Sequence, residues 1–360
     1  MARRFNFVAT GIGSLPFTDT GEACRLIFQY LPHAPHWPQL PNIDAREGMI
    51  EQFLEGAPGV AEKGGKPFLR PLEPYEEWER FYQGYEAIDL DAFAISKERG
   101  EGFYAFLEEL GRRKSFPFIK GQVTGPITLG LTLKDEAGAA AFFNPDLRDM
   151  LVKLTTMKAR WQEAAFKRLV PNAETITIFD EPILSSYGSA FMNVSRADVI
   201  SCLREAIAPL QGLKGVHICG NTDWPMIMEI GLDIIHFDAY KDLSSVLLYA
   251  EPLRRYLAAG RAISWGIVPT DEEALKGAVP SQLAARLLEG FEQIMQEGLA
   301  QDVLAGGSLI APSCGAGSLS EQGARKVYEM TAAVAGILRK ELAPLGSETY
   351  QGQGCEQLNA

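Results

Sequence analysis

The chain has 360 residues, of which 46% are hydrophobic and 22% charged, so its composition is that of a globular protein and excludes disorder as the main state. Its 34 Lys and Arg residues are outnumbered by 46 Asp and Glu residues, and the net charge of −12 disfavours nucleic acid and anionic membrane surfaces as partners. No apolar run is long enough to span a membrane and no signal-peptide cleavage site follows the N-terminus, so we expect a cytoplasmic protein.

Short apolar runs alternate with amphipathic helical patterns along most of the chain. Near-continuous apolar runs of this length are typical of buried parallel strands. The expected strands are residues 5–10, 116–123, 175–179, 215–219, 233–237, 262–265 and 308–311, with a weaker one at 87–95. The expected helices are residues 20–30, 147–169, 195–210, 243–258, 281–297 and 321–342.

This alternation predicts an α/β fold, a single (β/α)₈ TIM barrel over residues 1–343. An open doubly wound sheet is the alternative. The Pro-rich segment 31–41 (LPHAPHWPQLP) interrupts the alternation, and we expect it to be an N-terminal loop insertion that covers one end of the barrel. Residues 344–360 are polar and rich in Gly and Gln, which predicts a loose C-terminal tail.

A set of nitrogen and sulfur side chains follows the expected strands. His217 and Cys219 are two positions apart on one strand, so both point to the same side of it. Cys314 follows another strand, and Asp238 ends the strand after Cys219. Zn²⁺ prefers such donors, and three firm ligands with one exchangeable position are typical of catalytic zinc. We therefore predict a zinc site with Asp238 as the replaceable ligand. The alternative is that each cysteine is an ordinary core residue.

Motifs of several other enzyme classes are missing from the chain. It has no P-loop, no nucleophile elbow and no H-E-x-x-H motif, and Pro16 stands where a dinucleotide fingerprint begun at Gly11 needs its third glycine. The five cysteines are too sparse for a disulfide framework. Metal binding is therefore the chemistry that the sequence favours.

Four segments resemble the catalytic half of cobalamin-independent methionine synthase. They are Ile-Gly-Ser-Leu-Pro (12–16), Thr-Gly-Pro-Ile-Thr (124–128), Asp-Glu-Pro (180–182) and the pieces that carry the His and Cys residues above. The resemblance places the chain in the superfamily that also contains uroporphyrinogen decarboxylase and the methylcobamide:coenzyme M methyltransferases. It implies a (β/α)₈ barrel whose zinc ion activates a thiol for methyl transfer, with homocysteine converted to methionine in methionine biosynthesis.

The same resemblance implies roles for individual residues. The zinc ligands of the synthases correspond here to His217, Cys219, Asp238 and Cys314. Asp238 is a departure, because the synthases have Glu. Ser14 would contact the carboxylate of homocysteine and Asp180 its ammonium group, while the adjacent Glu181 is a further candidate for the substrate site. Helix or turn capping by Ser14 and Asp180, and a surface position for Glu181, are the structural alternatives.

The methyl donor also follows from the resemblance. The chain is about half as long as the full synthases and lacks the N-terminal barrel that helps them to hold methyltetrahydrofolate. Segment 217–222 resembles the coenzyme M methyltransferases, so we expect a corrinoid such as methylcobalamin, free or on a corrinoid protein. The alternatives are a decarboxylase-like lyase, a coenzyme M-type methyltransferase and a non-catalytic zinc- or corrinoid-binding barrel. The last stays open because segment 265–270 lacks the family's catalytic histidine.

Overall fold

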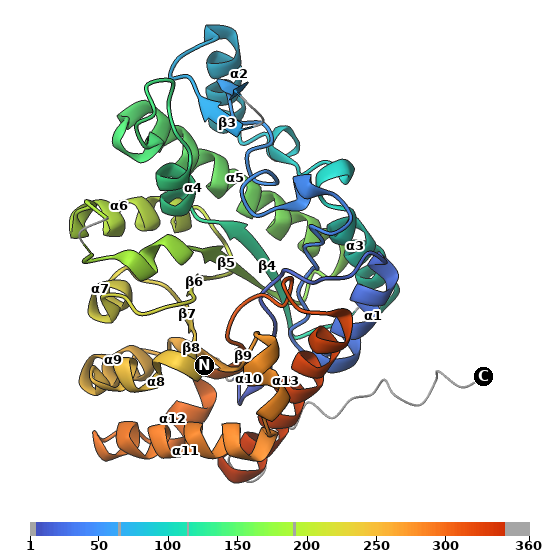
Figure 1. Cartoon of the computed structure of the whole chain (residues 1–360), viewed down its shortest axis with the longest axis vertical. Helices are drawn as coiled ribbons and strands as arrows, with labels where there is room; N and C mark the ends of the chain where they lie inside the picture. The colour runs from blue at the N-terminus through green and yellow to red at the C-terminus, as the bar shows by residue number, and fades with distance from the viewer. Residues whose placement is uncertain (1–4, 64–65, 114, 190–191, 343–360) are drawn as a thin grey trace.

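A curled parallel sheet of seven strands forms the centre of the computed structural model, which describes residues 5–63, 66–113, 115–189 and 192–342 (Figure 1). The strands lie in the order β1-β9-β8-β7-β6-β5-β4. Their bounds are β1 (Val8–Ala9), β4 (Phe118–Thr124), β5 (Glu174–Asp180), β6 (Leu213–Ile218), β7 (Ile234–Phe237), β8 (Ala262–Val268) and β9 (Ser308–Pro312). The seven main strands predicted from the apolar runs are all present, although β1 is shorter than expected.

Helices surround the outer face of this sheet (Figure 1). Their bounds are α1 (Thr20–Tyr30), α2 (Tyr75–Glu86), α3 (Glu101–Arg113), α4 (Pro126–Thr132), α5 (Pro145–Leu169), α6 (Arg196–Ile207), α7 (Trp224–Glu229), α8 (Ala239–Leu247), α9 (Ala250–Ala258), α10 (Glu272–Gly277), α11 (Pro280–Gln296), α12 (Gln301–Gly306) and α13 (Glu321–Leu342). Helix α5 packs on β4 and β5, α13 on β9 and β1, and α8 and α9 on β8. The helices bury the outer face of the sheet, and a second cluster of buried strand side chains, including Ile176, Ile234 and Leu309, packs inside the curl, which explains the near-continuous apolar runs.

The single helix expected at residues 243–258 is wrong, because α8 and α9 divide this stretch. Pro252 lies in the first turn of α9. A proline is tolerated there but not inside a longer helix, where it would remove a hydrogen bond and clash with the preceding turn. The chain therefore starts a new helix just before Pro252.

The Pro-rich segment 31–41 is not a lid. His36 and Trp37 are fully buried, and the segment runs between the edge strands β1 and β4. The Phe118 and Lys120 amides donate to the carbonyls of His33 and Pro35, and Gln39 exchanges two backbone hydrogen bonds with residues 13 and 15. These isolated bridges occupy the place expected for an eighth strand.

Strand pairing does not close the sheet, so the regular (β/α)₈ barrel expected from the sequence is confirmed only as a curled seven-stranded α/β sheet compatible with that fold. The physical reason lies in Pro35, Pro38 and Pro41. Proline has no N–H to donate, so an extended segment with several prolines forms isolated bridges in place of a continuous ladder.

An insertion lies between α1 and α3. It contains the antiparallel hairpin β2 (Val60–Lys63) and β3 (Lys66–Leu69), helix α2 and the short 3₁₀ helices η1 (Ala45–Glu47), η2 (Leu90–Phe93) and η3 (Lys97–Arg99). The weak strand expected at residues 87–95 is wrong, because η2 occupies it. Ile88 is 52% exposed while Phe93 and Ile95 are buried, so the stretch has no alternating face that a sheet could bury.

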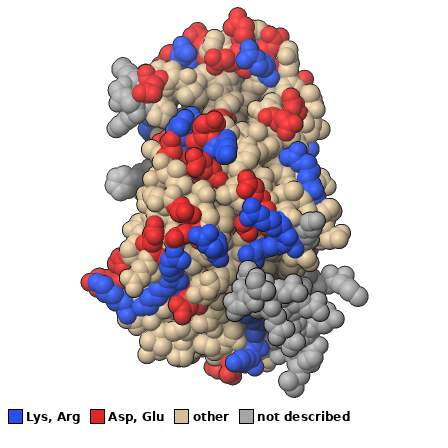
Figure 2. Space-filling model, turned by 90° about the vertical axis from the view of Figure 1, so that its right-hand side faces the viewer, with Lys and Arg blue, Asp and Glu red and all other residues tan. Residues whose placement is uncertain are grey.

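Charged side chains of both signs are interspersed over the face in Figure 2, and neither sign forms an extended patch there. Within the described ranges, no helix is long and apolar enough to cross a membrane. The tail expected at residues 344–360 lies outside the described residues, and the boundary at residue 343 stays a prediction.

Candidate metal centre

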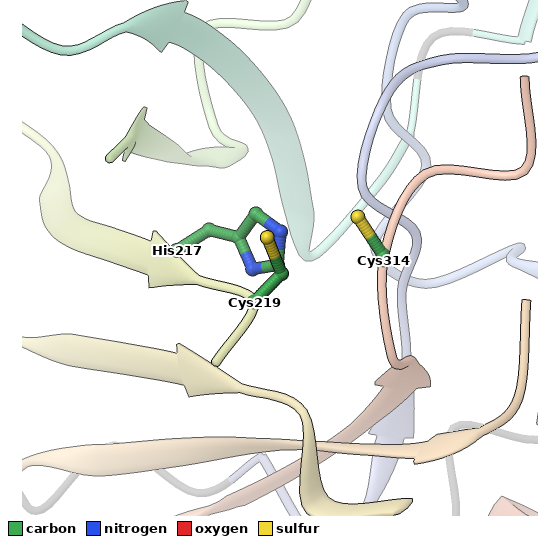
Figure 3. A group of neighbouring side chains, drawn as sticks. All are labelled: His217, Cys219 and Cys314. Atoms are coloured by element: carbon green, nitrogen blue, oxygen red, sulfur yellow. The ribbon is translucent and has the colours of Figure 1, made fainter. Parts of the chain in front are cut away.

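His217, Cys219 and Cys314 come together at the carboxyl edge of the sheet, with one potential ligand atom from each residue within 4.8 Å of the others. His217 is the second-last residue of β6 and Cys219 directly follows that strand, while Cys314 comes from the loop after β9 (Figure 3). The two sequence pieces meet because parallel strands all end at the same edge. The structure therefore brings together three of the four side chains that the sequence proposes as zinc ligands.

The donor set fits a zinc ion. Two thiols and one imidazole are the ligands that zinc prefers in tetrahedral sites. The Nδ1 atom of His217 is buried and has no hydrogen-bond partner, which is unusual for a buried polar atom. Two further residue positions could contribute a carboxylate, as described below, and a substrate could take the open position.

The two thiols of this cluster differ strongly in acidity. Hydrogen bonds from Cys314 and then from His217 lower the pKa of Cys219 to about 4. The same Cys219–Cys314 hydrogen bond raises the pKa of Cys314, and burial adds to the rise. The two thiols are therefore coupled, and the thiolate is favoured on Cys219. By contrast, burial raises the pKa of the core thiol Cys24 to about 12, so that cysteine is an inert apolar residue.

His236 packs against the back of the cluster. Its ring centroid lies 4.5 Å from that of His217 at an interplanar angle of 61°. The His236 Nδ1 atom is 2.9 Å from the Ser264 hydroxyl, and burial holds the pKa of His236 well below its usual range. A neutral His236 therefore packs against the His217 ring without adding charge.

Asp238 lies at the start of α8 and outside the group of three. Its Oδ1 atom accepts a hydrogen bond from the Lys241 amide at 2.9 Å, so the carboxylate caps the helix. Asp242, one turn further along α8, was not singled out from the sequence. Its pKa is raised by burial and further by the negative charge of Cys219. The zinc-ligand role of Asp238 stays a prediction, and Asp242 is a second carboxylate, near enough to Cys219 for their charges to interact.

Ser14 lies against the loop that carries Cys314. The Ala316 amide donates to the Ser14 carbonyl oxygen at 2.9 Å. A Cβ atom at Gly317 would lie 2.1 Å from the Ser14 Oγ, so only glycine lets the loop approach this hydroxyl. Ser14 and the metal cluster are thereby held on one rim.

Asp180 ends β5 and is paired in register with His217. Its Oδ1 atom is out of contact with solvent and has no hydrogen-bond partner. Burial raises the pKa of Asp180 to about 6, and the neighbouring His217 and Lys120 oppose the rise. The side chain does not cap a helix, because the cap position of the following 3₁₀ helix η5 (Pro182–Ser186) is Glu181. An unpartnered carboxylate oxygen beside the metal cluster is suited to bind a cationic group.

Glu181 is fully buried, not on the surface. Its carboxylate accepts hydrogen bonds from the Ile127 amide at 3.0 Å and from the Thr128 amide and hydroxyl at 2.7 and 2.6 Å. Burial raises the pKa of Glu181 to about 7 despite these donors. Both oxygens therefore hold the first turn of α4. This contact explains why the Thr-Gly-Pro-Ile-Thr and Asp-Glu-Pro segments occur together.

Comparisons with known proteins agree on the fold. No protein-family profile matches the sequence, and no curated protein matches it. Among solved structures, a B12-independent methionine synthase from Shewanella sp. W3-18-1 in complex with selenomethionine is similar, with a TM-score of 0.58 at 18% identity over 94% of this chain and 99% of that chain. A methyltransferase from Methanosarcina mazei has a TM-score of 0.56 at 12% identity over 95% and 94% of the two chains. The chain thus shares its fold with these two proteins.

Proposed function

We propose that the chain is a zinc-dependent methyltransferase that transfers a methyl group to a thiol, with homocysteine as the substrate and methionine as the product. The observation that carries the proposal is the approach of His217, Cys219 and Cys314 to within 4.8 Å at the carboxyl edge of the sheet. Support also comes from the fold shared with a methionine synthase of nearly the same length, of which this chain covers 99%.

His217, Cys219 and Cys314 would hold the zinc ion. When bound, zinc lowers the pKa of a coordinated thiol so that the sulfur is a thiolate nucleophile at neutral pH. The acidic thiol of Cys219 is already suited to be a ligand, because its pKa is about 4 without metal. His236 keeps the imidazole of His217 in one orientation through the ring contact and its Ser264 bond.

Ser14 and Asp180 would bind the amino acid part of the substrate. The Ser14 hydroxyl would donate to the carboxylate, and the free Oδ1 of Asp180 would accept from the ammonium group. Glu181 acts indirectly, because its oxygens are occupied by α4. Fixing both ends of the amino acid places its sulfur in a defined position and lowers the entropic cost of reaction.

The proposed donor is a methyl-corrinoid, free or on a corrinoid protein, in the reducing cytoplasm where thiols stay reduced. Its support is the resemblance of segment 217–222 to the coenzyme M methyltransferases. The test combines zinc-loaded protein with homocysteine and either methylcobalamin or methyltetrahydrofolate, and measures methionine by mass spectrometry. We expect methionine with methylcobalamin. Methionine from methyltetrahydrofolate alone would refute the donor, and no methyl transfer from either donor, despite bound zinc, would refute the function.

A further inference from the structure

Lys120 is a buried cation on β4 that the proposed mechanism does not use. Its side chain is 3% exposed, and its Nζ donates to the Ile12 carbonyl oxygen at 2.6 Å with Gln122 Oε1 at 3.4 Å. An ammonium has three N–H donors, so these contacts leave one for the interior of the sheet. Because a buried ammonium is costly unless it is paired and hydrogen-bonded, its place demands a partner of opposite charge.

Asp180 supplies a negative charge near Lys120. Lys120 and Asp180 line the same cavity of about 10 Å³, together with His236 and Ser264. This volume holds about one water molecule, so little solvent screens the two charges from each other. Burial lowers the pKa of Lys120 to about 8, and the charge of Asp180 opposes the fall. The ammonium thus supplies a positive charge that offsets the Asp180 carboxylate, whose Oδ1 is buried without a hydrogen-bond partner.

Lys120 also fixes the segment that carries Ser14. Its bond to the Ile12 carbonyl comes two residues before Ser14. At Gly13 a Cβ atom would lie 2.8 Å from Gln122 Nε2, so this segment lies directly against β4. One ammonium therefore connects the two side chains, Ser14 and Asp180, that are proposed to hold the amino acid group of the substrate.

We propose that Lys120 is a positioning residue that makes the substrate site selective for a zwitterionic amino acid thiol over a simple alkyl thiol. It does so by holding segment 12–14 through the Ile12 carbonyl and by offsetting the charge of Asp180. The inference rests on the proposed function. Since Lys120 is not a member of the metal cluster, its loss should weaken the binding of the substrate's amino acid group more than the binding of its sulfur.

The variants separate charge, hydrogen bond and general burial. Lys120→Met removes the charge and the donor at similar volume, and Lys120→Gln keeps an N–H donor without the charge. Lys158→Met is the matched control. Lys158 on α5 is fully buried, its Nζ has no hydrogen-bond partner, and burial lowers its pKa to about 8 as well. It differs from Lys120 in its place in the fold and in lacking a hydrogen bond like that of Lys120 to the Ile12 carbonyl.

The assay compares homocysteine with ethanethiol as acceptors from the same methyl donor. We expect Lys120→Met to lower kcat/KM for homocysteine about 10- to 100-fold, mainly through KM, and that for ethanethiol by less than about threefold. Lys120→Gln should recover part of the loss, and Lys158→Met should leave the ratio unchanged. Equal losses for both thiols, or the same change in Lys158→Met, would overturn the proposal.

Calorimetric binding of homocysteine to the zinc-loaded protein separates this inference from the proposed function. A wild-type protein that binds no homocysteine overturns both. A wild-type protein that binds it while Lys120→Met binds equally well overturns the role of Lys120 alone.

A double variant covers the case in which Lys120→Met fails to fold. Lys120→Met with Asp180→Asn leaves no uncompensated buried charge from the pair. In the Asp180→Asn background, the further loss of homocysteine affinity from Lys120→Met should be below about threefold, because the two residues act on one pocket. If this further loss of affinity is as large as the loss caused by Lys120→Met in the wild-type background, the coupling to Asp180 is overturned. If Lys120→Met alone does not fold, the loss caused by Lys120→Gln in the wild-type background is the reference.

Discussion

Replacement of one sulfur ligand is the most direct perturbation of the metal centre. A zinc site with four ligands has an apparent binding free energy of about 10–16 kcal/mol, or about 2.5–4 kcal/mol per ligand. Here three protein donors lie within 4.8 Å of one another. Loss of one thiol, in Cys219→Ser or Cys314→Ser, should therefore weaken zinc binding by about 100- to 1,000-fold.

The measurement is competition with a chromophoric zinc chelator at neutral pH, which gives Kd for the wild type and each variant. Cys202→Ser is the matched control, because Cys202 is a buried thiol of α6 outside the cluster. The Cys202→Ser variant should bind zinc with the same Kd as the wild type. If Cys219→Ser kept its Kd within about threefold of the wild type, the assignment of the cluster as a zinc site would be refuted.

The remaining predictions concern stability, the substrate and pH. Glu181→Gln replaces one acceptor oxygen by an NH2 group, so that a donor faces buried donors, and should lower the free energy of unfolding in urea by about 2–3 kcal/mol. Thr128→Val, which loses one of the three bonds, should lower it by about 1 kcal/mol. Gly317→Ala forces the Ser14 hydroxyl to move and should weaken homocysteine binding in calorimetry without loss of zinc; unchanged affinity would contradict the role of Ser14. Burial lowers the pKa of Lys158 from 10.5 to about 8, so the unfolded chain binds more protons between these values and stability should rise with pH there. Lys158→Met should remove about 3 kcal/mol of that rise, and an unchanged slope in urea titrations would contradict it.

The fold was predictable where burial is uniform along a strand. Strands that are buried on both faces have continuous apolar runs in the sequence, and all seven such runs are strands in the structure. The segment around His36 and Trp37 was wrongly expected to be a lid, because its prolines are typical of a loop although the segment is extended and buried between the edge strands β1 and β4. The hairpin β2–β3 has no comparable apolar signal in the sequence.

The site was predictable to the extent that strand geometry controls it. The i, i+2 spacing of His217 and Cys219 and the shared edge of parallel strands were enough to bring Cys314 to them. Asp242 was missed because its approach to Cys219 depends on where α8 begins. Lys120 was missed although a signal existed, since a lysine within a run otherwise expected to be buried is itself unusual.

The joint between β1 and β4 has a consequence for how the molecule opens. Segment 33–39 connects these two edges through a few backbone hydrogen bonds, whereas neighbouring strands elsewhere in the sheet are paired by continuous ladders. Hydrogen exchange should therefore begin at this seam, with the amides of Gln39 and Lys120 losing protection first. Local unfolding there would separate Ser14 from Lys120, while strands β6 to β9 keep their backbone hydrogen bonds. The proposed zinc ligands on β6 and after β9 would then stay together while the proposed amino acid site opens. The protein should therefore retain the metal during fluctuations that release the organic substrate.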